Sequence, residues 1–126
     1  MVKINKKKLG VYLFALMIVL LILYNLEWGG SEEEKAFAQC LRDNGAVFYG
    51  AYWCSHCIQQ KSDLGNSKNI PYVECSLPNR AGQNDICNNA GIESYPTWEF
   101  SDGERLVGFL SKEVLSEKTG CIFNSD

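Results

Sequence analysis

The sequence predicts an α/β domain in which helices flank a central mixed sheet, preceded by one membrane-spanning helix. Three observations lead to this fold class. The chain starts with a long apolar run, helix-like and strand-like segments alternate after it, and a hairpin signal follows near the end. With 46% apolar and 21% charged residues, the composition is that of a globular protein. The part after the apolar run is the size of one small domain.

The apolar run "LGVYLFALMIVLLILYNL" occupies 9–26, and Asn25 is its only strongly polar residue. At about 1.5 Å of rise per residue, such a helix just crosses a hydrocarbon core of about 30 Å. The alternative is a cleaved signal peptide, but Glu27 and Trp28 stand where its cleavage site requires a small residue. The expected division of the chain is a cytoplasmic basic tail over 1–8, a transmembrane anchor over 9–26, a linker over 27–30 and a folded domain over 31–126.

The charges around the anchor predict its orientation. Four lysines precede it, and the first charges after it are glutamates: Lys3, Lys6, Lys7 and Lys8, then Glu27, Glu32, Glu33 and Glu34. The lysine end should therefore stay in the cytoplasm, which places the domain in the periplasm, at the cell exterior or in a lumen. After the anchor, eight Lys or Arg against fifteen Asp or Glu give a net charge of −7. This charge argues against binding nucleic acid or an anionic membrane surface.

The first two elements of the domain follow from local signals. Ser31 and Glu34 form a capping-box pattern, and apolar residues at helical spacing predict a helix over 31–44 that Gly45 ends. The next segment, "AVFYGAY" at 46–52, is short, apolar and aromatic. It is therefore expected to be a buried strand.

A second helix and strand complete a βαβ unit. The segment "CSHCIQQKSDLG" predicts a helix that begins at Cys54 and ends at Gly65. The strand "IPYVEC", 70–75, follows this crossover helix, so the two strands should be parallel.

The last third predicts a short helix, a hairpin and a closing helix. The turn-rich loop "SLPNRAG" leads to a helix within 83–91. The strands "PTWEF" and "RLVGFL" flank Asp102-Gly103, which predicts an antiparallel pair. Ser111 can then cap the helix "KEVLSEKTG".

The segment "WCSHC" places two cysteines at the start of a helix. A thiolate attacks a disulfide, and the helix N-terminus offers Cys54 free N–H groups and a partial positive charge. His56, the only histidine, adds positive charge when it is protonated, and the Cys57 thiol can donate a hydrogen bond to Cys54. We expect Cys54 to be the exposed attacking thiolate and Cys57 the buried resolving thiol, with His56 supporting them.

Stabilising that thiolate also makes the disulfide form a stronger oxidant. The site should therefore tend to donate disulfides. The Cys54–Cys57 pair is itself the expected redox centre, and we expect no further cofactor and no metal.

The other four cysteines also follow the anchor, as expected for disulfides in an oxidising compartment. We expect the pairs Cys75–Cys87 and Cys40–Cys121, worth about 3 and about 4.5 kcal/mol in the chain-entropy model. One alternative is that some are free buried thiols. Another is a zinc site built from Cys54, Cys57, Cys75 and Cys87, but the last two lack the close spacing of a structural zinc site.

The segments "WCSHC" and "SYPT" resemble the thioredoxin superfamily, in which a cis-proline loop packs opposite the active-site cysteines. The resemblance implies a thioredoxin-like fold and a cis Tyr95–Pro96 bond. It also implies that the Tyr95 backbone pairs with an extended substrate, with Trp53 and Pro96 in the same binding surface. The alternative is an ordinary strand-edge proline with a trans bond at Pro96.

A closer resemblance covers nearly all of 36–121. The stretches "FAQCLRDNGAVFYGAYWCSHCIQQKSDLG", "PYVEC" and "GIESYPTWEFSDGERLVGFLS" resemble the thioredoxin-like domain fused to bacterial and plant vitamin K epoxide reductase homologues. In that family the domain exchanges disulfides with a quinone-linked membrane enzyme and passes them to exported proteins. Here a lone helix takes the place of the fused enzyme, so the resemblance implies a separate membrane partner.

Two positions depart from the thioredoxin pattern. Phe48 stands where thioredoxin has a buried acidic residue. Proton transfer by a carboxylate at this position is therefore not available. Ser55 stands where proline is common, which would loosen the helix start and shift the potential.

The sequence as a whole predicts a membrane-anchored extracytoplasmic thiol-disulfide oxidoreductase that supports disulfide formation in exported proteins. One alternative is a disulfide reductase or isomerase in the same compartment. Another is a non-catalytic tethered binding module whose cysteines are only structural.

Overall fold

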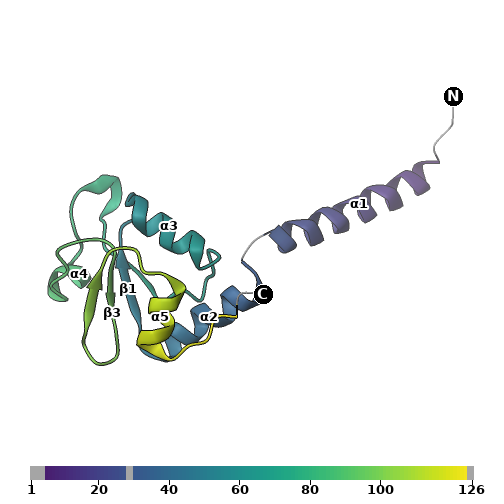
Figure 1. Ribbon diagram of the computed structural model, residues 1–126. Helices are drawn as coiled ribbons and strands as arrows, with labels where there is room; N and C mark the ends of the chain where they lie inside the picture. Colours follow the sequence, from purple (N-terminus) through teal and green to yellow (C-terminus); the bar gives the residue numbers. More distant parts are fainter. Residues whose placement is uncertain (1–4, 28–29, 125–126) are drawn as a thin grey trace.

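The computed structural model describes residues 5–27 and 30–124, so the parts of the expected tail, linker and C-terminus at 1–4, 28–29 and 125–126 lie outside the described residues. Helix α1, Lys6–Glu27, stands apart from the domain (Figure 1). It is long and apolar enough to cross a membrane, although a signal sequence would pass the same test. The helix begins before the expected anchor and includes Lys6, Lys7 and Lys8.

Asn25 is the polar exception in this helix. Its Nδ2 donates to the carbonyl of Leu21 at 2.6 Å. A polar side chain bonded within its own helix is less costly in hydrocarbon than an unpaired one. The residue is thus compatible with the membrane anchor that we expected.

The domain contains a four-stranded mixed sheet in the order β2-β1-β3-β4. Its strands are β1 (Val47–Gly50), β2 (Tyr72–Glu74), β3 (Thr97–Glu99) and β4 (Arg105–Val107). β1 pairs parallel with β2 and antiparallel with β3, and β3 pairs antiparallel with β4. The predicted mixed sheet, the βαβ unit and the final hairpin are therefore confirmed.

The helices begin where the capping signals predicted. They are α2 (Glu32–Asp43), α3 (Ser55–Asp63), α4 (Asp85–Asn89) and α5 (Lys112–Thr119), with a 3₁₀ turn at Pro78–Arg80. Ser31 and Glu34 form the full capping box of α2, and Ser111 caps α5 through the N–H of Val114. Gly120 ends α5 with a φ of +74°, a conformation that favours glycine.

Two cores lie on opposite faces of the sheet. The larger core joins α2, α3 and α5 to Phe48 and Trp98, whose rings stack 4.9 Å apart. The smaller core contains Tyr49, Ile92 and the buried pair Cys75 and Cys87. Figure 1 shows α4 on the side of the sheet away from α2, α3 and α5. Helices thus cover both faces, and the domain has a thioredoxin-like fold.

The strands are shorter than the sequence predicts. The strand expected over 46–52 ends at Gly50, because Tyr52 and Trp53 lie in a turn. The strand expected over 70–75 covers only Tyr72–Glu74. The early end of β1 leaves the turn free to bring Cys54 to the start of α3.

Candidate redox site

Cys54 is the N-cap residue of α3, as the sequence predicted. Its backbone is extended, with φ −79° and ψ 119°, and its Sγ accepts a hydrogen bond from the N–H of Cys57 at 3.4 Å. The N–H of Cys54 in turn donates to the carbonyl of Ala51 at 3.0 Å, which closes the turn after β1. The two cysteines therefore face each other across the first turn of the helix, within reach of a disulfide.

The solvent exposure of Cys54 and Cys57 corrects one expectation. Cys54 is only 8% exposed and packs against the larger core, so the expected exposed thiolate is wrong as stated. Tyr95 packs against the same core. Cys57 is 1% exposed, so Cys54 is still the more accessible of the two. His56 is exposed at the second position of α3.

The surroundings of Cys57 favour its neutral thiol. Burial first, and then the hydrogen bond with Cys54, raise the pKa of Cys57 to about 12. The positive charge of Lys61 acts in the opposite direction on this pKa. A protonated Cys57 can donate to the sulfur of Cys54, as the resolving thiol of such a pair should.

The three expected substrate-binding residues lie beside Cys54. The Tyr95–Pro96 peptide bond is cis, Pro96 is buried and Tyr95 is half-buried. The rings of Trp53 and Tyr95 meet edge to face with their centroids 6.0 Å apart. Trp53 is 41% exposed, and its Nε1 donates to Ser76 Oγ at 2.9 Å. An exposed aromatic surface thus borders the cysteine pair.

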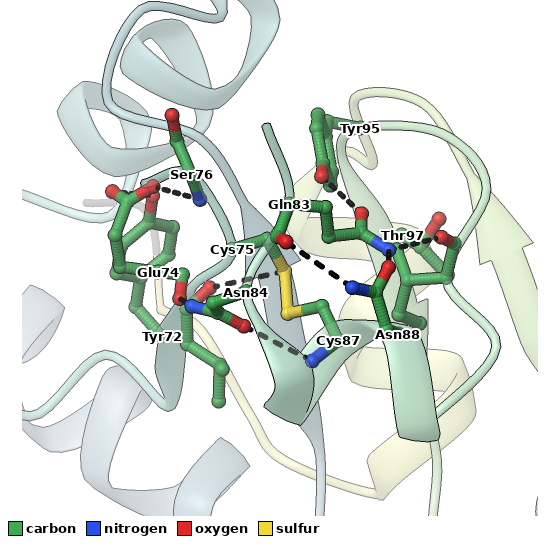
Figure 2. Close-up of a disulfide and its surroundings, with 12 residues drawn as sticks. Tyr72, Glu74, Cys75, Ser76, Gln83, Asn84, Cys87, Asn88, Tyr95 and Thr97 are labelled. Atoms are coloured by element: carbon green, nitrogen blue, oxygen red, sulfur yellow. Dashed lines mark hydrogen bonds between the residues drawn. A yellow bond between two sulfur atoms is a disulfide. The ribbon is translucent and has the colours of Figure 1, made fainter. Parts of the chain in front are cut away.

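A polar network behind this loop was not found from the sequence. Figure 2 shows the Tyr95 hydroxyl donating to Gln83 Oε1, while Gln83 Nε2 donates to Asn88 Oδ1 at 2.9 Å. The same amide donates to the carbonyl of Ile92 at 2.8 Å. Gln83 therefore connects the loop of Tyr95 to the segment around α4. Its partners lie five, nine and twelve residues further along the chain, and no local motif indicates them.

The other four cysteines form two disulfides. Cys40 in α2 bonds Cys121, and Cys75 at the end of β2 bonds Cys87 in α4 (Figure 2), with Cα–Cα distances of 5.9 and 5.5 Å. These are the pairs expected from the sequence, and Cys121 follows the end of α5. Cys54 and Cys57 are free thiols. The Cys75–Cys87 bond removes two of the four thiols that the zinc alternative needs.

Gln60 fixes α3 against the rest of the domain. Its side chain is fully buried, and Oε1 accepts from the N–H of Leu110 at 2.8 Å and from Trp98 Nε1 at 3.3 Å. Its Nε2 donates to the carbonyl of Leu110 at 3.0 Å. A buried amide with all these bonds holds the helix that carries both cysteines. The sequence offered no sign of this role.

The chain is similar to the thiol-disulfide oxidoreductase LTO1 of Arabidopsis thaliana. The two are 40% identical over 90 residues, which make up 68% of this chain and 24% of that protein. The chain thus spans about a quarter of the length of this curated relative. No protein-family model matches the chain. The similarity and the fold together support a relationship to thioredoxin-like redox proteins.

Proposed function

We propose that this protein is an oxidoreductase that exchanges disulfides with other proteins through Cys54 and Cys57. The observation that carries the proposal is the hydrogen bond from Cys57 N–H to Cys54 Sγ at the start of α3. A helix N-terminus stabilises an anionic sulfur at its cap. Cys57, with its neutral thiol, lies in the first turn of the same helix. The similarity to a protein named as a thiol-disulfide oxidoreductase supports the same chemistry.

Donation of a disulfide takes two exchange steps. A substrate thiolate attacks Cys54 Sγ of the oxidised pair, which forms a mixed disulfide and releases Cys57 as a thiolate that takes up a proton. A second substrate thiolate attacks the substrate sulfur of the mixed disulfide and releases Cys54. The substrate loses two electrons and the Cys54–Cys57 pair gains them. The pair itself is the redox centre, so the exchange requires no separate cofactor.

Trp53, Tyr95 and Pro96 would bind the substrate. Trp53 offers an exposed aromatic face, and the backbone at Tyr95 would pair with an extended substrate chain. Protonated His56, exposed one turn from Cys54, would favour the thiolate and hence the donation of disulfides. A reductase or isomerase would use the same residues with the pair held reduced.

We place the domain outside the cytoplasm on a single-pass anchor. The apolar helix α1 and the lysines at its start support this orientation. The oxidised pair would be regenerated by a separate quinone-linked membrane enzyme of the vitamin K epoxide reductase type. The resemblance of 36–121 to domains fused to such enzymes supports this partner, and exported proteins with free thiols would be the substrates.

Trapping of mixed disulfides tests the function. In cells that express the full chain with Cys57→Ala, Cys54 should accumulate mixed disulfides with other proteins, visible as mass-shifted bands that a reductant removes. The matched control Cys54→Ala should give none, because its remaining thiol is buried. A non-catalytic binding module would give no such bands with either variant, and that result would contradict the proposal.

A further inference from the structure

The buried position of Cys57 raises the question of what supports its thiolate. In donation a second substrate thiolate releases Cys54, but when the Cys54–Cys57 bond re-forms from a mixed disulfide, Cys57 must lose its proton and attack Cys54 Sγ as a thiolate. Its side chain is 1% exposed, and burial disfavours the charged form. Phe48 occupies the strand position where thioredoxin carries an acid. A nearby positive charge would therefore help Cys57 to attack when the Cys54–Cys57 bond re-forms.

Lys61 is placed to act on Cys57. It follows Cys57 by four residues on α3, so the two side chains lie on the same face of the helix. Its Nζ lies 3.3 Å from the centroid of the Tyr72 ring, a cation–π contact that fixes the ammonium over the ring. Lys61 is half-buried, so its charge is screened less than that of a surface lysine.

Gly50 brings the same ring to the sulfur of Cys57. A Cβ atom built on Gly50 would lie 2.8 Å from Tyr72 Cε2 and 2.9 Å from Cys57 Sγ. Both atoms thus occupy the space that a side chain would fill at the end of β1. The Tyr72 ring therefore lies close to the sulfur of Cys57, and the ammonium of Lys61 lies over the same ring.

Glu74 holds the ring in this position. Its Oε2 accepts from the Tyr72 hydroxyl at 2.7 Å, and its Oε1 accepts from the N–H of Ser76 at 2.8 Å (Figure 2). Oε1 also accepts from the N–H of Tyr52 at 3.2 Å, in the turn before Cys54. One carboxylate thus ties the ring of β2 to the turn that presents the attacking sulfur.

We propose that the ammonium of Lys61, held on the Tyr72 ring by Glu74, stabilises the thiolate of Cys57 in the step that resolves mixed disulfides. The inference rests on the proposed function. In this step the Cys57 thiol gives its proton to water, its thiolate attacks Cys54 Sγ, and the substrate leaves as a thiolate. The exchange needs no outside oxidant, because the Cys54–Cys57 bond forms as the bond to the substrate breaks.

The surrounding charges agree with this role. Burial is the largest effect on the pKa of Cys57 and raises it, whereas a backbone hydrogen bond at Ala51 and, more weakly, the charge of Lys61 lower it, and burial lowers the pKa of Lys61 itself. Glu74 and Tyr95 are further titratable groups near Lys61 and Cys57. The negative charge of Glu74 raises the pKa of Lys61, which opposes the effect of burial. Lys61 and Tyr72 line a cavity of about 370 Å³ together with Arg42 and Lys68, and Cys57 is not among the residues that line it.

A two-phase reaction separates the roles of the two cysteines. The reduced full chain in detergent is mixed with the aromatic disulfide 5,5′-dithiobis(2-nitrobenzoate), and the released coloured thiolate is followed by stopped flow. The first release reports attack by Cys54, and the second reports resolution by Cys57. Lys61→Met should slow the second release at least tenfold at neutral pH, move its pH profile upward and leave the first release unchanged.

Matched variants make the result specific. Lys61→Arg should restore most of the second rate, Lys61→Gln should behave like Lys61→Met, and Lys68→Met, an exposed lysine of the same cavity, should change neither phase. Equal second rates and pH profiles in wild type, Lys61→Met and Lys61→Gln would overturn the inference while leaving the function intact. A wild-type protein without a first release that depends on Cys54 would overturn the proposed function itself.

Discussion

The backbone N–H of Cys57 donates to the sulfur of Cys54 at 3.4 Å, so one atom serves as both the cap of α3 and the expected nucleophile. A cap satisfies an N–H group that the helix would otherwise leave unpaired, and an anionic acceptor does this better than a neutral one. In the thiolate form that we propose for Cys54, formation of a disulfide removes the negative charge from the helix N-terminus. The reduced protein is therefore favoured, and its disulfide form is expected to be oxidising.

The raised pKa of Cys57 predicts how its reactivity depends on pH. Because its pKa is raised to about 12 and burial is the first cause, the thiol should stay protonated at neutral pH even after Cys54→Ala removes the neighbouring sulfur. Alkylation of Cys57 in that variant should rise about tenfold per pH unit well above pH 9. Mass spectrometry of iodoacetamide-treated protein measures it. A rate that levels off near pH 9, as in a denatured control with its disulfides intact, would contradict this account.

Gln60 should be required for stability. Gln60→Leu would leave the N–H and carbonyl of Leu110 and the indole N–H of Trp98 without their partner. Unpaired buried groups of this kind should lower the free energy of unfolding by about 3 kcal/mol. Guanidinium unfolding followed by tryptophan fluorescence measures the loss. The exposed neighbour is the control, because Gln59→Leu should change stability by less than about 0.5 kcal/mol.

The two structural disulfides should differ in their contribution. Cys40–Cys121 closes a loop with a sequence separation of 81, and Cys75–Cys87 one of 12. In the chain-entropy model, replacing the first pair by serines should cost about 4.5 kcal/mol and replacing the second about 3 kcal/mol. Urea unfolding of the two double variants tests the order. A larger loss from the shorter loop would show that local packing outweighs loop closure here.

Gln83 should position the loop of Tyr95, which we propose binds the substrate. Gln83→Ala removes the acceptor of the Tyr95 hydroxyl and the bonds to Asn88 and Ile92, but it touches neither cysteine. We expect KM for a reduced protein substrate to rise about fivefold while kcat changes less than twofold, a loss of about 1 kcal/mol in binding. Steady-state oxidation of the substrate measures both constants. An equal fall in kcat with unchanged KM would instead indicate an effect on the cysteine pair.

Local signals were sufficient for much of the fold. Side-chain caps satisfy N–H groups within three residues, so Ser31 and Ser111 indicated the starts of α2 and α5. The Asp102-Gly103 turn indicated the final hairpin, in which Gly103 has a φ of +86°. The start of α3 at Cys54 was likewise predicted from the local sequence.

Features that depend on distant contacts could not be predicted. Cys54 belongs to a buried cluster whose other members, such as Leu41 and Trp98, come from distant parts of the chain. Gln60 and Glu74 look like ordinary polar residues until the fold brings Leu110 and Trp98 to the first and the N–H of Tyr52 to the second. The length of β1 was overestimated because aromatic residues favour strands, whereas Tyr52 and Trp53 lie in a turn.

A redox titration against glutathione tests the central claim most directly. The full chain is equilibrated with mixtures of reduced and oxidised glutathione, trapped in acid, alkylated and analysed by peptide mass spectrometry. We predict one reversible two-electron transition confined to Cys54 and Cys57, while Cys40–Cys121 and Cys75–Cys87 stay oxidised throughout. If Cys54 and Cys57 formed no mutual disulfide at any ratio, or if the reversible transition belonged to another pair, the proposed exchange through Cys54 would be wrong.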